Sequence, residues 1–152
     1  MDWKLLKDLV ARAGCSPGAP GSTERIMALL CLSAFHDIMK MDFLQPIVQP
    51  NHAPFHGYEA GVRIHDHDFA LSYVLECFPS LLPSYAGLPS NEKRGVLFTQ
   101  SEMQFNHGWF VQAEAPPGGM LSKFKALLMA GAEQTDIDLY FLHWITDLAG
   151  AE

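Results

Sequence analysis

The segment Ser33–Lys40 brings an imidazole, a carboxylate and an ammonium group within a few residues of one another. His36 and Asp37 are adjacent, and Lys40 follows three positions after Asp37. The segment ends a long apolar run with helical spacing, in which Asp37 lies seven residues after Leu30, so His36 and Asp37 are both predicted to face the core. A buried carboxylate without a partner is costly. The sequence therefore favours a bound metal ion that would compensate the negative charge of Asp37.

A second cluster, His-Asp-His-Asp at residues 65–68, lies directly before another apolar helical pattern. One interpretation is structural, because Asp66 or Asp68 can cap the N-terminus of that helix beside a solvated histidine. The other interpretation is that the cluster supplies at least one metal ligand, with His67 and Asp68 as the candidates. The sequence leaves both interpretations open.

A third pair, His143 and Asp147, is four residues apart in the last helical pattern. This spacing places both side chains on one face, one turn apart, where they can hold one ion or hydrogen-bond to each other. His107, between Asn106 and Gly108, is a further candidate site residue, although a structural turn explains this sequence equally well.

Apolar residues at helical spacing dominate the chain and predict a mainly α-helical single domain over residues 1–152, built as a helical bundle. Leu30 and Phe35 are expected in its core, and Trp3 on the inward face of the first helix. An irregular loop is expected over residues 43–61, where His52 or His56 is an alternative site residue. A short strand or an extended segment is expected over Gly95–Thr99. Helices are expected from the Asp2 cap to Ala13, from Thr23 to about Met41, over Phe69–Phe78, over Leu121–Ala130 after a stop at Pro116–Gly119, and from Thr135 onward. Because the chain stops at Glu152 soon after Gly150, a truncated last helix and a fragment of a longer protein remain open.

The composition narrows the classes of partner. Hydrophobic residues make up 49% of the chain and charged residues 18%, which is typical of a globular protein. The net charge of −7 and the lack of a basic run argue against a nucleic acid duplex as partner. The three cysteines show no metal-type pairing, and no signal peptide or apolar run of ~20 residues is present. We therefore expect a cytoplasmic protein with reduced thiols and no membrane span.

Several familiar chemistries lack their motifs. The chain contains no Gly-x-Ser-x-Gly nucleophile elbow, no phosphate-binding Walker loop and no dinucleotide fingerprint. The cysteines lie in a loop or in apolar patterns, which argues against a cysteine nucleophile and a cysteine zinc site. The histidines and aspartates remain, and such ligands suit divalent ions that activate water against phosphorus.

The sequence His36-Asp37-Ile38-Met39-Lys40 resembles the His-Asp-Ile-Gly-Lys signature of the HD-domain phosphohydrolases, an all-α, metal-dependent superfamily. The resemblance implies that His36 and Asp37 are metal ligands and that Lys40 faces the phosphate. It implies that Asp147 is the distant aspartate ligand of the last helix. His65 or His67, together with His107, would match the histidines that some members add for a second metal.

Two departures from the family pattern are visible. Met39 replaces the usual glycine, and residues 1–35 contain no histidine to match the family's first ligand. The leading hypothesis is nevertheless a metal-dependent phosphohydrolase that acts on a nucleotide or another phosphorylated small molecule. Its cofactor would be one or two divalent ions, such as Mn, Fe, Mg or Zn, and Lys40 and His107 would assist the reaction.

Two other functions remain open. The first is a non-catalytic helical module that binds a protein or a small molecule, which the missing upstream histidine and the aromatic and methionine content favour. The second is a helical metal-binding protein of another function that uses the same histidines and aspartates. The sequence does not identify the substrate, the metal or the oligomeric state.

Overall fold

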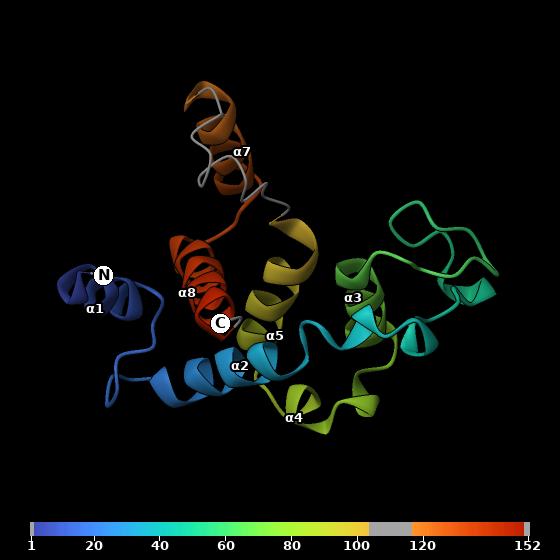
Figure 1. Cartoon of the computed structure of the whole chain (residues 1–152), viewed down its shortest axis with the longest axis horizontal. Helices are drawn as coiled ribbons and strands as arrows, with labels where there is room; N and C mark the ends of the chain where they lie inside the picture. The colour runs from blue at the N-terminus through green and yellow to red at the C-terminus, as the bar shows by residue number, and fades with distance from the viewer. Residues whose placement is uncertain (1, 104–116, 151–152) are drawn as a thin grey trace.

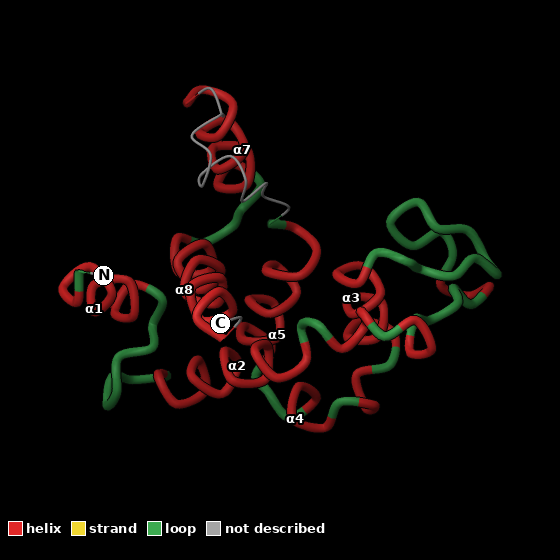
Figure 2. The backbone as a smooth tube through the Cα atoms, viewed as in Figure 1, coloured by secondary structure: helices red, strands yellow, loops and turns green. Residues whose placement is uncertain are grey.

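The structure is a computed structural model that describes residues 2–103 and 117–150. The described part is mainly α-helical, which confirms the predicted fold class. Figure 1 and Figure 2 show the helices, with α7 projecting at the top of the view and a long, mostly irregular segment before α3 at the right. The helices are α1 (Trp3–Arg12), α2 (Ser22–Phe35), α3 (His67–Cys77), α4 (Pro83–Ala86), α5 (Ser90–Leu97), α7 (Pro117–Met129) and α8 (Gln134–Gly150). Short helical turns are η1 (Ile38–Lys40), η2 (Asp42–Leu44), η3 (Pro50–His52), η4 (Pro79–Leu81) and η5 (Phe98–Glu102).

Helix α2 lies against both α5 and α8 (Figure 1). Its buried face is formed by Ala28, Leu32 and Phe35, so the prediction for Phe35 is confirmed. The prediction for Leu30 is wrong, because its side chain is 57% exposed. Leu30 is two residues from both Ala28 and Leu32, and at ~100° per residue it points away from the face that they share.

Helix α2 also ends earlier than the sequence predicted. It stops at Phe35, and the chain continues through Asp37 into the separate turn η1. The helical phase that was expected to bury both His36 and Asp37 therefore does not extend to them. The side chain of His36 is 18% exposed and that of Asp37 is 44% exposed, so the expectation of a deeply buried Asp37 is wrong.

Helix α1 begins as predicted, with the Asp2 carboxylate accepting a hydrogen bond from the Lys4 N–H. Its C-terminal half packs on α8, where Leu9 contributes to a buried cluster with Leu142. Trp3, in the first turn of α1, is exposed, so the inward orientation predicted for it is wrong.

Helix α3 is the most completely buried helix of the described chain, with every residue from Ala70 to Leu75 buried. Its N-cap is Asp66, whose Oδ1 accepts hydrogen bonds from the Asp68 and Phe69 N–H groups at 3.0 Å each. The structural interpretation of Asp66 is therefore confirmed. The cap fixes where α3 starts and so places His67 and Asp68 at its first turn.

Two predictions of local structure are wrong. Residues 95–99 form the end of α5 and the start of η5 and not a strand. Short apolar runs such as this one satisfy either periodicity, and packing against α2 and α8 decides for the helix. The predicted stop before Leu121 is also wrong for residues 117–119, because α7 already begins at Pro117, and a proline is tolerated at the start of a helix.

A buried ionic network, which the sequence did not reveal, joins α2, α5 and α8. Arg25 Nε lies 3.0 Å from Glu92 Oε2, and Arg25 Nη1 lies 3.4 Å from Asp136 Oδ1. Arg94 Nη2 lies 3.5 Å from the other Asp136 oxygen. Gly95 makes room for this network, since a Cβ at that position would lie 2.8 Å from Arg25 Nη1. The network fixes α8 against the other two helices and so positions the site described below.

Among the described residues, none of the helices combines the length and the apolar character needed to cross a membrane.

Candidate metal centre

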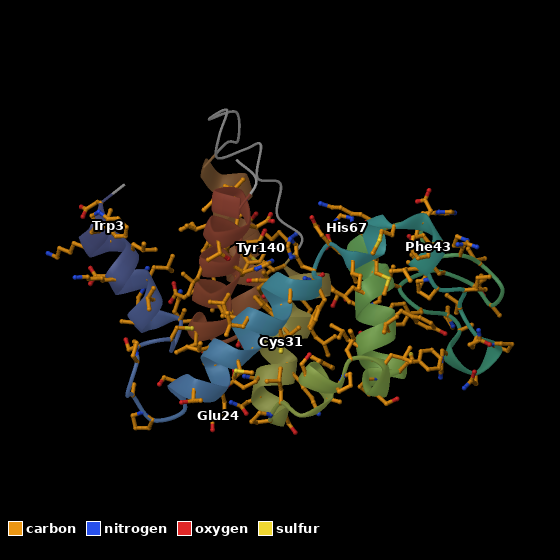
Figure 3. All side chains as sticks on the ribbon, turned by 60° about the horizontal axis from the view of Figure 1, so that its bottom comes forward. Trp3, Glu24, Cys31, Phe43, His67 and Tyr140 are labelled. Atoms are coloured by element: carbon orange, nitrogen blue, oxygen red, sulfur yellow. The ribbon has the colours of Figure 1, made fainter. Side chains whose placement is uncertain are left out.

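A cavity of about 710 Å³ lies between η1, the start of α3, η5 and α8. Two of its lining residues, His67 and Tyr140, are labelled in Figure 3, where they lie toward the upper side of the view. The lining combines ionisable and aromatic side chains: His36, Asp37, Lys40, Asp66, His67, Asp68, Phe69, Thr99, Gln100, Met103, Tyr140, His143, Trp144 and Asp147. Six predicted metal ligands therefore line one cavity, although they come from distant parts of the chain: His36, Asp37, His67, Asp68, His143 and Asp147.

His36, Asp37 and Asp147 meet at one wall of this cavity. His36 Nε2 lies 2.9 Å from Asp147 Oδ1 and 3.5 Å from Asp37 Oδ1, although His36 and Asp147 are 111 residues apart. Each of the three offers one ligand atom, and these atoms lie within 4.8 Å of one another. The predicted convergence of the three side chains is confirmed, and their role as metal ligands stays a prediction.

His36 has a polar contact on each side of its ring. Nδ1 lies 3.3 Å from the Ser33 carbonyl oxygen, and Nε2 lies 2.9 Å from Asp147 Oδ1. Which nitrogen donates depends on the tautomer of the ring. An N–H on Nε2 satisfies the short contact to Asp147, and so does a metal ion bound by Nε2 and Oδ1.

Asp37 divides its two oxygens between different groups. Oδ2 accepts a hydrogen bond from Lys40 Nζ at 2.7 Å, whereas Oδ1 faces His36 and His67, the latter at 3.9 Å. Partial burial alone would raise the pKa of Asp37, but the Lys40 hydrogen bond and the charge of His36 outweigh it and lower the pKa. Asp37 is therefore ionised at neutral pH, with Oδ1 turned to the histidines.

His143 is buried behind His36 on α8. The centres of the two imidazole rings are 4.7 Å apart, with the planes nearly perpendicular. Burial and the nearby charge of His36 lower the pKa of His143 to about 4, so its ring is neutral at neutral pH. Its Nδ1 is buried and has no hydrogen-bond partner among the described residues. A neutral imidazole with an unused nitrogen is the form that binds metals.

His67 and Asp68, at the start of α3, line the same cavity as His36, Asp37 and Asp147. His67 Nε2 lies 3.6 Å from Asp68 Oδ1, and with Asp66 they make a second group whose ligand atoms could hold an ion. Desolvation raises the pKa of Asp68, and the neighbouring charge of His67 only partly opposes it. Because Asp66 already caps α3, it is the least available ligand of the second group.

The other histidines lie elsewhere or outside the described residues. His65 Nδ1 lies 3.1 Å from Gln45 Oε1, and His52 Nδ1 lies 3.0 Å from the Tyr73 hydroxyl. His56 stacks on Phe69 with ring centres 4.7 Å apart. None of these three lines the cavity. His107 lies outside the described residues.

A smaller cavity of about 330 Å³ is lined by several of the same residues. His36, Asp37, His143 and Asp147 line both cavities, and Thr146 lines the smaller one. The four titratable side chains therefore lie where two cavities meet the same residues.

Sequence reasoning missed the residues that complete the larger cavity: Thr99, Gln100, Met103, Tyr140 and Trp144. Tyr140 and Trp144 share the spacing of the His143–Asp147 face, which is a usable signal, since residues three and four apart share a helix face. Gln100 carried no sequence signal.

A comparison of the chain with protein-family models, curated proteins and solved structures gives no match to any of them.

Proposed function

We propose that the chain is a divalent-metal-dependent hydrolase of phosphoesters. The observation that supports this most directly is the meeting of His36, Asp37 and Asp147 at the wall of a cavity of about 710 Å³. Imidazole nitrogens and carboxylate oxygens together suit Mn, Fe and Zn, and carboxylates alone suit Mg. The 2.9 Å contact between His36 Nε2 and Asp147 Oδ1, which joins residues 111 positions apart, is a second support that is independent of the sequence motif.

The residues of the wall have distinct parts in this proposal. His36, Asp37 and Asp147 would hold the ion, with His143 as a fourth donor behind His36. A bound divalent ion supplies a Lewis acid that lowers the pKa of water and offsets phosphate charge. The Ser33 carbonyl orients His36 and Lys40 orients Asp37, which are supporting hydrogen bonds of the kind that metal ligands usually have.

Two further side chains of the cavity, Lys40 and His67, can contact the substrate. The Lys40 side chain is exposed and reaches the cavity edge beside Asp37, where it can pair with a phosphate oxygen. His67 lies between Asp37 and Asp68 and can donate a proton to a leaving oxygen. Both tasks require only that the phosphate lie between η1 and the start of α3.

The test is hydrolysis of p-nitrophenyl phosphate and of its bis-ester by purified protein with Mn²⁺, Mg²⁺ or Zn²⁺. We expect Asp37→Asn and Asp147→Asn to lower the rate at least about a hundredfold, because each replaces a charged ligand. Asp8→Asn, on the exposed side of α1, is the matched control and should keep the wild-type rate. Wild-type protein that hydrolyses neither ester with any of the ions would contradict the proposal.

A non-catalytic binding module remains the second candidate, for one specific reason. Large apolar side chains are exposed over residues 41–62, including Met41, Ile47, Val62 and Phe43, the last 79% exposed. Exposed apolar groups in one region are typical of interaction surfaces. This candidate takes the place of the first if the wild-type protein binds no divalent ion.

A further inference from the structure

Gln100 has an unusual position in the wall of the larger cavity. The residue is only 5% exposed, and its Oε1 is buried without a hydrogen-bond partner among the described residues. Its side chain nevertheless forms part of the cavity lining, in the same cavity as His36 and Asp147. Buried amide oxygens almost always have a partner. Gln100 Oε1 itself is fully buried, so a ligand in the cavity becomes its partner when the amide turns toward the cavity.

Gln100 lies in the turn η5, whose other polar groups bond to the backbone. The Met103 N–H donates to the Phe98 carbonyl at 2.9 Å, which closes a turn of the wide π type. The Thr99 hydroxyl donates to the Gly95 carbonyl and the Ser101 hydroxyl to the Leu97 carbonyl, so both neighbours of Gln100 are bonded to the backbone. Turns of this type inside helices are frequent at functional sites.

Aromatic side chains surround the same part of the chain. Phe69, Tyr140 and Trp144 line the cavity together with Gln100. Phe69 is held in place by stacking on His56, with 27° between the ring planes. Aromatic rings beside one amide are the chemistry that recognises a planar heteroaromatic group, because the rings supply stacking and the amide reads its hydrogen-bonding edge.

We infer that Gln100 is a specificity-determining residue whose carbonyl accepts a hydrogen bond from an N–H group of a planar heteroaromatic substituent, as in a nucleobase. The inference rests on the proposed function in one respect: the phosphate of the same molecule would lie at the His36–Asp37–Asp147 wall. The terminal torsion of a glutamine is soft, so the amide can turn Oε1 toward the ligand. The cavity of about 710 Å³ lies in the range of small-molecule sites.

The test measures binding to metal-free protein in the presence of a chelator, so it does not depend on hydrolysis. The ligands are the 5′-monophosphates of adenosine, guanosine, cytidine and uridine, each of which has a base N–H donor. Ribose 5-phosphate lacks the base, and purine riboside 5′-monophosphate has an aromatic base without an N–H donor. The variant is Gln100→Met, which keeps the length of the side chain and removes the amide. Gln49→Met, at an exposed residue outside both cavities, is the matched control.

We expect at least one nucleotide to bind about fivefold or more tightly than both comparison ligands, as one hydrogen bond commonly gives. Gln100→Met should abolish that difference and leave binding of ribose 5-phosphate unchanged, whereas Gln49→Met should preserve the difference. The inference is overturned if no nucleotide exceeds both comparison ligands, or if Gln100→Met retains the preference with wild-type thermal stability. Failure of the proposed function is seen separately, as absent hydrolysis of p-nitrophenyl phosphate.

Discussion

The substitution Gly95→Ala tests whether the buried ionic network holds the helices that carry the site. The new Cβ would lie 2.8 Å from Arg25 Nη1 and 3.3 Å from Asp136 Oδ1, and both distances are too short for an undisturbed structure. The guanidinium must therefore move away from Asp136, whose carboxylate is almost fully buried. Arg25 is itself buried and tied to Glu92, so it has little freedom to do so.

The expected magnitude follows from opposing contributions. Overpacking of a filled interior costs about 1–3 kcal/mol, and a weakened hydrogen bond to a buried charge costs about 1.5–3 kcal/mol. Alanine is favoured over glycine inside a helix by about 1 kcal/mol, which offsets part of the loss. We expect Gly95→Ala to lower the free energy of unfolding by about 1.5–5 kcal/mol. The matched control is Gly118→Ala in α7, where a Cβ would meet nothing within 4 Å and stability should not fall.

Urea denaturation followed by circular dichroism measures both variants, and a double-mutant cycle identifies the cause. In an Arg25→Met background the guanidinium is absent, so Gly95→Ala should destabilise less, because only the contact with Asp136 and Leu139 remains. If Gly95→Ala is as stable as Gly118→Ala, or equally destabilising with and without Arg25, the network does not constrain α5 against α8 as described.

Two further predictions concern the core and the buried imidazole. Leu32→Ala should lower the free energy of unfolding by about 2–5 kcal/mol and Leu30→Ala by less than about 0.5 kcal/mol, because Leu32 is fully buried and Leu30 is exposed. Equal midpoints of urea denaturation for the two variants would contradict the assigned buried face of α2. For His143, the pKa is near 6.5 in the unfolded chain and about 4 in the folded protein, so its contribution to stability is fully present above pH 6.5 and is lost as the pH falls toward 4. The wild type should lose about 3 kcal/mol more stability between pH 7 and pH 4 than His143→Gln, at about 1.4 kcal/mol per pKa unit. His65→Gln, at an exposed ring, is the control. If the difference in free energy of unfolding between the wild type and His143→Gln does not vary with pH, the burial of His143 is contradicted.

The features predicted correctly from the sequence are mostly local. The Asp2 and Asp66 caps follow from side chains that bond to their own helix, and the shared face of His143 and Asp147 follows from helix geometry. The meeting of His36 with Asp147 was predicted as the packing of two helices that carry the same residue types, and the structure confirms the contact.

The features that were missed depend on packing between distant segments. The Arg25–Asp136 contact joins residues 111 positions apart and has no local pattern. The early end of α2 and the helical conformation of residues 95–99 both follow from contacts with α3, α5 or α8, which override weak local preferences. Gln100 could not be found because its only distinguishing property, an unpaired buried oxygen, exists in the folded chain alone.

The most direct test of the central claim is calorimetric titration of Mn²⁺ into metal-free protein. We predict binding of a divalent ion, because His36, Asp37 and Asp147 offer ligand atoms that lie within 4.8 Å of one another. Asp147→Asn should weaken binding about tenfold or more, and Asp8→Asn should leave it unchanged. Absence of binding to the wild type, or equal binding to Asp147→Asn, would contradict the assignment of this wall as a metal centre.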